Sequence, residues 1–208
     1  MINGLMTVVL AYVLGAIPFG YLLVKWRTGK DVRGSGSGNI GATNVLRTTG
    51  PTAGVATLVL DIGKGYLAVW LAGTLTAPAG GPGDPLWMGA AALAVMAGHS
   101  YPVFLRFHGG KAVASFVGAF ACLTPLPMAA VLVVFLAVVW WTRRISMGSI
   151  VAAAVFPLGV WLIQKPALPV VWSAVLAGAF IIYRHRSNIE RLNRGTEPTF
   201  RLGSGNGR

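Results

Sequence analysis

Small residues, side-chain hydroxyls, two carboxamides and a terminal cation share one short stretch, GSGSGNIGATNVLR at residues 34–47. Glycine and serine leave backbone N–H groups open, and an arginine supplies a charge-assisted bond, so this composition suits a phosphate. The candidate ligands are Ser37, Asn39, Thr43, Asn44 and Arg47. A Gly-x-Gly-x-x-Gly spacing also occurs here, but no strand or βαβ unit surrounds it, which argues against a dinucleotide site. A flexible loop is the alternative interpretation.

A second polar segment ends in Gly109, Gly110 and Lys111. Two glycines and a lysine that open a helix would present backbone donors, a positive dipole end and an ammonium group together, which suits a second phosphate. It is not a Walker A loop, because Ala112 stands where that motif requires serine or threonine. The alternative is a glycine turn followed by a lysine that anchors the helix at the membrane interface.

The third polar group combines Ser149 with His185 and Asn188 near the C-terminus. A three-residue spacing places His185 and Asn188 on one face of a continuing helix. Glu190, five residues after His185, gives a pattern similar to the His-x4-Asp motif of some acyltransferases, but with the wrong acid. The arginines that follow are typical of the basic stop after a final membrane span.

Two opposite charges, Asp61 and Lys64, lie inside an apolar run. A spacing of three residues lets them pair on one helical face, which lowers the cost of burying either. A structural ion pair is the favoured interpretation, and a proton relay is the alternative. His99 by itself is more typical of a hydrogen-bonded structural histidine than of a catalyst.

Membrane helices are the elements that must position these residues. The 208-residue chain is 55% hydrophobic and 11% charged, whereas an ordinary soluble domain has about a quarter charged residues. This composition excludes a soluble enzyme and, despite a net charge of +12, a water-exposed groove for nucleic acid. Apolar runs predict seven spans, at about 4–24, 52–76, 86–105, 112–124, 125–142, 147–163 and 167–183. The fourth is short, so a broken or partial helix is an alternative there.

The cations predict the orientation. Of the 17 Lys and Arg residues, Lys64 lies in a span and Lys165 in the last short connection; the other 15 fall in every second connection or the C-terminal segment. Because basic residues are retained in the cytoplasm, the N-terminus is expected outside, the C-terminus inside and all three polar segments on the cytoplasmic side. The fold class is therefore an all-α integral membrane protein. Residues 1–201 are expected to form one membrane domain, and 202–208 a disordered tail.

The acidic residues and the cysteine limit the chemistry. Five carboxylates scattered along the chain argue against a metal site, and the single Cys122 cannot form an intramolecular disulfide or a multi-thiolate zinc site. No Gly-x-Ser-x-Gly nucleophile motif occurs. We therefore expect no metal, and we expect no other cofactor.

In order and spacing, these segments resemble the bacterial acyl-phosphate:glycerol-3-phosphate acyltransferases of the PlsY type. The resemblance covers nearly the whole chain and includes residues 36–47, Asp61, Lys64-Gly65, Gly98-His99, 102–104, Gly109-Gly110-Lys111, Ser146, Gly148-Ser149, 184–189 and 195–198. It implies seven spans in the bacterial inner membrane. It also implies transfer of a fatty acyl group from acyl phosphate to the 1-hydroxyl of sn-glycerol 3-phosphate, giving lysophosphatidic acid and phosphate. This reaction is the first acylation of phospholipid synthesis, without a metal.

The resemblance also implies roles for single residues. The catalytic set is Ser37, Arg47, Lys111, His185 and Asn188, and the substrate-binding set is Ser37, Asn39, Thr43, Asn44, Arg47, Gly109, Gly110, Lys111, Ser149, His185 and Asn188. The chain departs from the family at Ala112, where glycine is usual, and at Ser115, where threonine is common. Either His185 or the donor's own phosphate, with a second pKa near ~6, accepts the hydroxyl proton.

Two other functional classes compete. A transporter for phosphorylated solutes would also use glycine-interrupted helices and helix N-termini to hold anions. A carrier needs polar groups across the membrane, however, and the predicted outer half carries few besides Asp61 and Lys64. A structural membrane protein would leave the serine, asparagine, threonine and histidine content unexplained. The two substrates and membrane lipids are the partners that we expect, and the sequence identifies no protein partner.

Overall fold

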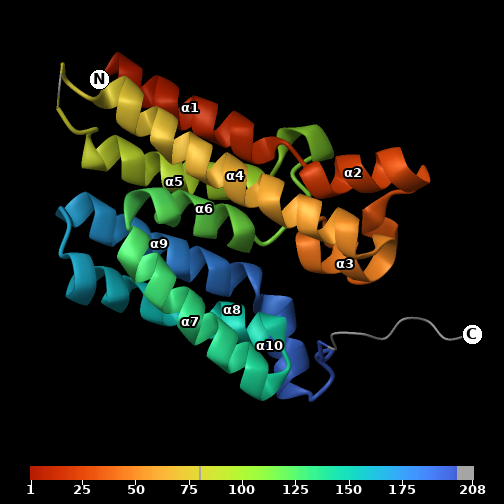
Figure 1. Cartoon of the computed structure of the whole chain (residues 1–208). Coiled ribbons are helices and arrows are strands. Elements are labelled where there is room, and N and C mark those ends of the chain that lie inside the picture. Colours follow the sequence, from red (N-terminus) through yellow and green to blue (C-terminus); the bar gives the residue numbers. More distant parts are fainter. Residues whose placement is uncertain (80, 201–208) are drawn as a thin grey trace, which may run out of the picture.

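The computed structural model describes residues 1–79 and 81–200, and the regular elements in this part of the chain are all helices (Figure 1). In order they are α1 (Ile2–Ala16), α2 (Phe19–Thr28), η1 (Val32–Gly34), α3 (Ala42–Thr49), α4 (Pro51–Thr76), α5 (Pro85–Ser100), η2 (Val103–Leu105), α6 (Val113–Leu123), α7 (Pro125–Thr142), α8 (Ile145–Gly159), η3 (Val160–Gln164), α9 (Leu168–Arg184) and α10 (Arg186–Asn193). The prediction of an all-α fold is confirmed. The predicted disordered tail at 202–208 lies outside the described residues.

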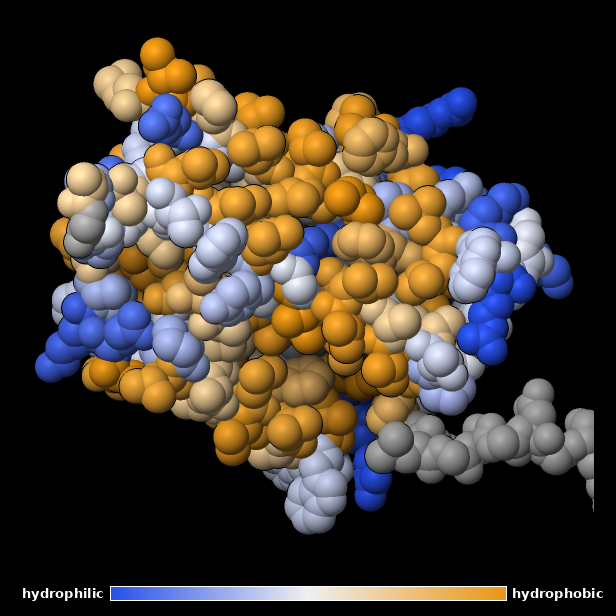
Figure 2. All heavy atoms as spheres, turned by 45° about the horizontal axis from the view of Figure 1, so that its top comes forward, coloured by the Kyte–Doolittle hydropathy of each residue, from blue (hydrophilic) through white to orange (hydrophobic). Residues whose placement is uncertain are grey.

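Five helical segments in the described chain are long and apolar enough to cross a bilayer: Ile2–Thr28, Pro51–Thr76, Pro85–Leu105, Pro125–Thr142 and Ile145–Gln164. A sixth is counted if α9 and α10, which meet at a bend of 56°, form one span. The space-filling view shows apolar side chains covering the middle of the visible face, with hydrophilic residues gathered mainly toward its two ends (Figure 2). The number of seven spans stays a prediction.

The predicted span at 112–124 is the short helix α6, with 11 residues. At about 1.5 Å per residue it is about 16 Å long, roughly half of the ~30 Å hydrocarbon core of a bilayer. Pro125 starts α7 directly after Thr124, because proline suits the first turn of a new helix and lacks the N–H that a continuing one requires. Close packing against α4 holds α6 in place: a Cβ atom at Gly118 would lie 1.9 Å from the carbonyl oxygen of Ile62.

The predicted span at 4–24 is divided into α1 and α2, which separate at Pro18. The residue before proline is extended, so the carbonyl of Ile17 accepts no N–H four residues on, and its backbone partner is the N–H of Phe19 at 3.1 Å. Lys64 of α4 donates to that carbonyl oxygen at 2.9 Å, and its Nζ lies 2.8 Å from Asp61 Oδ1. The predicted Asp61–Lys64 ion pair is thus confirmed, and it also stabilises the break in the first span.

The prediction that His185 and Asn188 share one face of a continuing helix is wrong. The chain bends by 56° at His185, which follows the end of α9 and precedes α10. The carbonyl of His185 then accepts the backbone N–H groups of Asn188, at 2.8 Å, and Ile189, at 2.9 Å. The bend redirects α10 and brings Asn188 to Lys111, whose Nζ donates to Asn188 Oδ1.

Two apolar clusters support the elements that carry the polar segments. The larger one lies between the long helices and contains Phe116, Phe120 and Phe156, whose ring centroids are 4.8 to 5.1 Å apart. The smaller one joins Val24, Val32, Ile40, Val45, Ala53 and Leu105 beneath the segment at residues 34–47. Figure 1 places α2, α3 and α10 at one end of the bundle and the N-terminus at the other. The polar segments therefore have rigid supports at a common end.

Candidate active site

Asn44, in the first turn of α3, determines the shape of the loop at residues 34–41. Its Nδ2 donates to the carbonyls of Ser35, at 3.0 Å, and Asn39, at 2.8 Å. Its Oδ1 accepts the backbone N–H of Ser37 at 2.8 Å. Gly36 has a φ of +60°, and a Cβ there would lie 2.2 Å from Asn44 Oδ1, so only glycine fits. Both the oxygen and the nitrogen of the Asn44 amide form hydrogen bonds within this segment. We therefore infer that Asn44, which the sequence predicted as a substrate ligand, maintains the shape of the loop and does not contact the substrate.

The expectation that this loop offers open backbone donors is partly wrong. Three of its N–H groups bond within the loop: Ser37 to Asn44 Oδ1, Gly38 to the carbonyl of Ser35 at 3.1 Å, and Gly41 to Asn39 Oδ1 at 2.8 Å. The side chains of Ser37, Thr43 and Arg47 have no hydrogen-bond partner among residues 1–79 and 81–200, and Ser37 and Arg47 are exposed. A ligand can therefore reach these three groups.

The backbone N–H groups of Gly109 and Gly110 are not open donors either. Gly109 N–H bonds the carbonyl of Ser100 at 3.2 Å, and Gly110 N–H bonds the carbonyl of His99 at 3.1 Å. A Cβ at Gly110 would lie 2.1 Å from His99 Nε2, and a Cβ at Gly109 would lie 2.2 Å from the His99 carbonyl oxygen. The two glycines thus allow a close backbone approach to α5, which directs Lys111 away from it.

His99 has the structural role that the sequence favours. It is buried, and its Nδ1 lies 3.5 Å from Asp61 Oδ1 and 3.4 Å from Ser115 Oγ. The ring therefore joins α5 to α4 and α6. Ser115, one of the two departures from the family pattern, contributes a hydroxyl to this contact, which threonine would also supply.

Lys111 begins a chain of hydrogen bonds that links three distant parts of the sequence. Its Nζ donates to Asn188 Oδ1 at 2.5 Å, and Asn188 Nδ2 donates to Glu197 Oε1 at 2.7 Å. Ser146 Oγ donates to the same carboxylate oxygen at 2.6 Å, and Arg191 Nε donates to Oε2 at 2.8 Å. An ammonium only donates and a carboxylate only accepts, so the Asn188 amide between them has one satisfied orientation.

Glu197 and Ser146 are members of this cluster that sequence reasoning left out of the predicted site. Burial alone would raise the pKa of Glu197, but the hydrogen bonds from Ser146, Asn188 and Arg191 outweigh it and hold the pKa below its ordinary value. The signal was available in part, because Glu197 is one of only five acidic residues in the chain.

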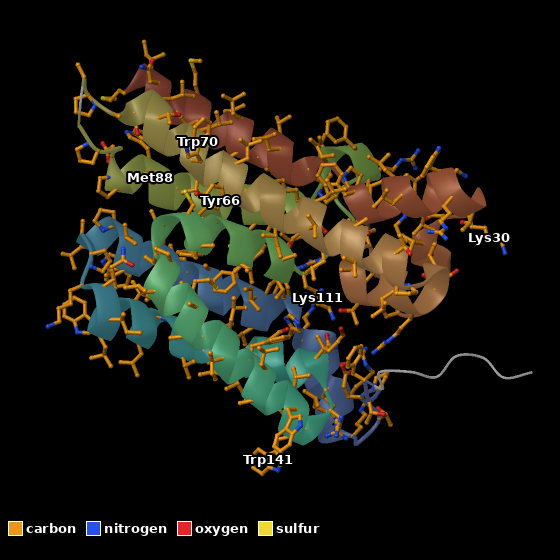
Figure 3. The ribbon with its side chains drawn as sticks, viewed as in Figure 1. Lys30, Tyr66, Trp70, Met88, Lys111 and Trp141 are labelled. Carbon is orange, nitrogen blue, oxygen red and sulfur yellow. The ribbon has the colours of Figure 1, made fainter. Side chains whose placement is uncertain are left out.

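The environment of Lys111 shows which charges share its space. Burial lowers the pKa of Lys111 to about 8, the carboxylate of Glu197 opposes this shift, and the positive charges of Arg191, Arg184 and Arg47 add to it. Figure 3 shows Lys111 toward the end of the bundle that carries α3 and α10, so the residue 34–47 segment and the Lys111 cluster lie toward a common end. Several cations gathered around a partly desolvated lysine favour a bound anion.

His185 is buried and neutral near pH 7. Burial is the main cause that lowers its pKa to about 4, and the charge of Lys111 adds to it. Its Nδ1 lies 2.8 Å from the carbonyl oxygen of Ile181, so Nδ1 carries the hydrogen and Nε2 has the lone pair. His185 can accept a hydrogen bond, but it is a weak base.

Ser149 is buried on α8, and its hydroxyl donates to the carbonyl of Ile145 at 3.0 Å. Ser146, three residues earlier on the same helical face, is the residue of α8 that joins the Lys111 cluster. Charge effects and hydrogen bonds therefore bring together Arg47, Lys111, His185 and Asn188, while Ser149 extends the α8 face beside them. Within the described residues, no three His, Cys, Asp or Glu side chains form a group that could hold a metal.

Comparison with known proteins decides the family. A family model described as glycerol-3-phosphate acyltransferase matches residues 5–195. The chain belongs to the glycerol-3-phosphate acyltransferase family. It is 45% identical over 201 residues to the glycerol-3-phosphate acyltransferase of Geobacter sulfurreducens, covering 97% of this chain and 100% of that one. The corresponding protein of Trichlorobacter lovleyi is 46% identical over 204 residues, with the same coverage.

Two crystal structures of PlsY (YgiH), an integral membrane glycerol 3-phosphate acyltransferase, have the same fold. The glycerol 3-phosphate form is 37% identical with a TM-score of 0.86, covering 95% of this chain and 96% of that one. The lysophosphatidic acid form is 36% identical with a TM-score of 0.84, covering 95% of each chain. This member of the glycerol-3-phosphate acyltransferase family is therefore an integral membrane protein that crosses the membrane several times.

Proposed function

We propose that the protein transfers a fatty acyl group from an acyl phosphate to the 1-hydroxyl of sn-glycerol 3-phosphate. The products are lysophosphatidic acid and inorganic phosphate, and the reaction starts phospholipid synthesis. One observation carries the proposal: Lys111, which bonds Asn188 of α10, lies toward the same end of the bundle as α3, which carries Arg47, so two cations from separate segments are available there (Figures 1 and 3). Both substrates of this reaction carry a phosphate, and each needs a cationic partner. Relatives with glycerol 3-phosphate and lysophosphatidic acid forms support the acceptor and the product.

The two cations take different substrates in this proposal. Arg47 can bind a phosphate through two parallel hydrogen bonds, and Ser37 and Thr43 add hydroxyls that have no partner within the described chain, so this segment holds glycerol 3-phosphate. Lys111 is a compact charge directed by Asn188, and it binds the phosphate of the acyl donor. Asn188 can donate to the acyl donor the Nδ2 hydrogen that Glu197 does not accept, and Ser149 can donate its hydroxyl once that group turns away from the carbonyl of Ile145.

The chemical step needs no covalent enzyme intermediate, because an acyl phosphate is already activated. The 1-hydroxyl oxygen attacks the carbonyl carbon, a C–O ester bond forms, and the C–O bond to phosphate breaks. The hydroxyl proton moves to an oxygen of the leaving phosphate. Positioning and charge stabilisation supply the rate, and the step needs no metal.

The donor's phosphate is the base in this proposal. Its second pKa near ~6 makes it the stronger acceptor, because the pKa of His185 is about 4. His185 Nε2 instead accepts a hydrogen bond that orients the acceptor.

The excess of Lys and Arg at the end of the bundle with α2, α3 and α10 supports a cytoplasmic site in the bacterial inner membrane. The acyl chain of the donor then lies between the membrane helices, which it reaches from the inner leaflet. The carbonyl carbon can meet the site without the chain leaving the bilayer.

The test mixes detergent-purified protein with palmitoyl phosphate, labelled glycerol 3-phosphate and EDTA, and follows lysophosphatidic acid. Lys111→Ala is compared with Lys165→Ala, a matched control because Lys165 is exposed in the connection after η3. We expect product with EDTA present, loss of product in Lys111→Ala and wild-type rates in Lys165→Ala. A folded wild-type sample that makes no product from any acyl phosphate would refute the proposed donor.

A further inference from the structure

Arg184, the last residue of α9, binds the glycine loop that precedes Lys111. Its Nη2 donates to the carbonyl of Gly110 at 2.9 Å and to that of Gly109 at 3.4 Å, and its Nε donates to the Gly110 carbonyl at 3.3 Å. The guanidinium carbon lies 4.8 Å from the centroid of the Tyr101 ring. The chemistry proposed above gives this arginine no role.

The loop is therefore held along both of its edges. The N–H groups of Gly109 and Gly110 bond the end of α5, and their carbonyls bond Arg184. Glycine has the freest backbone of all residues, so a Gly-Gly pair keeps one conformation only where other groups fix it. With both edges held, the next side chain, Lys111, starts from a defined position.

Arg184 also belongs to the element that receives the Lys111 ammonium. It directly precedes His185 at the bend between α9 and α10, and Asn188 follows within the first turn of α10. Two contacts thus connect this bend to the lysine. Arg184 fixes the backbone from which the side chain starts, and Asn188 Oδ1 accepts the ammonium at its tip.

We propose that Arg184 is a positioning residue for Lys111. By holding the carbonyls of Gly109 and Gly110, it places the ammonium against the phosphate of the acyl donor, and it does not touch the substrate itself. This inference rests on the proposed function in taking acyl phosphate as the donor.

The geometry disfavours a direct phosphate contact by Arg184. Two of its three guanidinium nitrogens donate to backbone carbonyls, and Tyr101 covers one face of the group. A lysine at this position would keep the charge but lose the planar fork that reaches both carbonyls. The substitution Arg184→Lys therefore tests the hydrogen bonds to the glycine carbonyls separately from the positive charge.

The experiment compares Arg184→Gln and Arg184→Lys with Arg186→Gln. Arg186 is a matched control because it is exposed, lies two residues away and packs over Tyr183, with 4.9 Å between its guanidinium carbon and the ring centroid. Steady-state assays give kcat and the KM for each substrate. We expect Arg184→Gln to lower kcat/KM for palmitoyl phosphate about 100-fold, since a displacement of about 1 Å costs that much. Arg184→Lys should lose about 10-fold, and Arg186→Gln should stay within about 2-fold.

The pattern of losses separates positioning from general damage. Arg184→Gln should change the KM for glycerol 3-phosphate by less than about 2-fold, because Arg47 binds that substrate. In the double variant with Lys111→Met, the Arg184→Gln substitution should cause no further loss, because both act through one ammonium. Losses that multiply, or equal losses for both substrates, would overturn the proposal. If Arg184→Gln does not fold, the same tests on Arg184→Lys decide it.

Binding of inorganic phosphate, measured by calorimetry, separates this inference from the proposed donor. We expect Arg184→Gln to weaken phosphate binding about as much as Lys111→Met does, with Arg186→Gln unchanged. If wild-type protein makes no product but the variants bind phosphate in this order, the donor is wrong and the positioning role stands. Unchanged phosphate binding in both Arg184 variants would reject the positioning role.

Discussion

The two segments that carry the proposed substrate cations are stabilised in different ways. The segment at residues 34–47 is held by its own Asn44, whose hydrogen bonds join residues at most 12 positions apart. The segment that ends in Lys111 is held by residues far along the chain. Its contacts with Arg184 and Asn188 join positions 74 to 77 apart.

This difference separates two ways of building a binding site. The first segment carries its own scaffold, so its shape depends on local sequence and its ligand groups face outward. The segment that ends in Lys111 has its observed shape only when α5, α9 and α10 are packed together. Damage to a distant partner should therefore change Lys111, whereas damage in the first segment should stay there.

Glu197→Gln should have the largest effect, because this carboxylate joins Ser146, Asn188 and Arg191 around Lys111. A buried charged group that loses its bonding pattern costs about 2–5 kcal/mol. We expect activity to fall at least about 100-fold and the Tm in detergent to fall. Glu190→Gln is the control, since Glu190 is exposed on α10, the helix that carries Asn188 and Arg191. Equal effects of the two substitutions would contradict the role given to Glu197.

Arg47→Ala should act within the first segment alone. We expect the KM for glycerol 3-phosphate to rise about 10- to 100-fold, the size of a lost charge-assisted contact, while the KM for palmitoyl phosphate changes by less than about 3-fold. Substrate titrations at saturating donor measure this directly. An unchanged KM for glycerol 3-phosphate would refute the assignment of Arg47 to the acceptor.

Acid should destabilise the second segment and spare the first. The pKa of His185 falls to about 4 in the folded protein, below the ordinary value of 6.5, so the unfolded chain binds the proton first as pH falls. Stability should therefore be complete above pH 6.5 and decline by about 3 kcal/mol toward pH 4. Glu197, whose pKa is also lowered, adds a loss in the same direction below about pH 4.5.

A series of Tm measurements between pH 4 and 8 checks this. His185→Gln should flatten the slope between pH 6.5 and 4, because it removes the titrating ring. Directly before the first segment, the lowered pKa of Asp31 comes mainly from its exposed pair with Arg33, which contributes little to stability. Asp31→Asn should therefore leave the slope as it is, and a slope that survives His185→Gln would contradict the assignment.

The sequence predicts the local features well and the distant ones poorly. Apolar runs, the basic connections and the Asp61–Lys64 spacing each leave a periodic or compositional signal. Five of the seven predicted runs are found as helices long enough to cross a membrane, and the ion pair is found as predicted. The bend at His185 has no proline or glycine to mark it. The hydrogen bond between Ser146 and Glu197 joins residues 51 positions apart, and no periodic pattern in the sequence indicates a contact over that separation. Glycine patterns indicate a close backbone approach, but Gly110 approaches His99 of the protein itself, where the sequence suggested a ligand.

Ala112→Gly should have the smallest effect, although Ala112 is the main departure from the family pattern. The residue has a φ of +61° in the left-handed region, which costs an alanine about 1 kcal/mol, and glycine would relieve that strain. Its methyl group, however, is 1% exposed and packs in the larger apolar cluster, so removing it loses about 0.8 kcal/mol. The free energy gained by relieving the strain and the free energy lost with the methyl nearly cancel. Because the methyl is buried in the apolar cluster, its removal should leave donor binding unchanged. We expect the Tm to move by less than about 3 °C and the KM for palmitoyl phosphate by less than about 2-fold. Ala119→Gly in the middle of α6 gives the matched control, because this alanine is buried in the same cluster and without strain to relieve it should lower the Tm by more. A large change of KM in Ala112→Gly would mean that the backbone at this position contacts the donor phosphate.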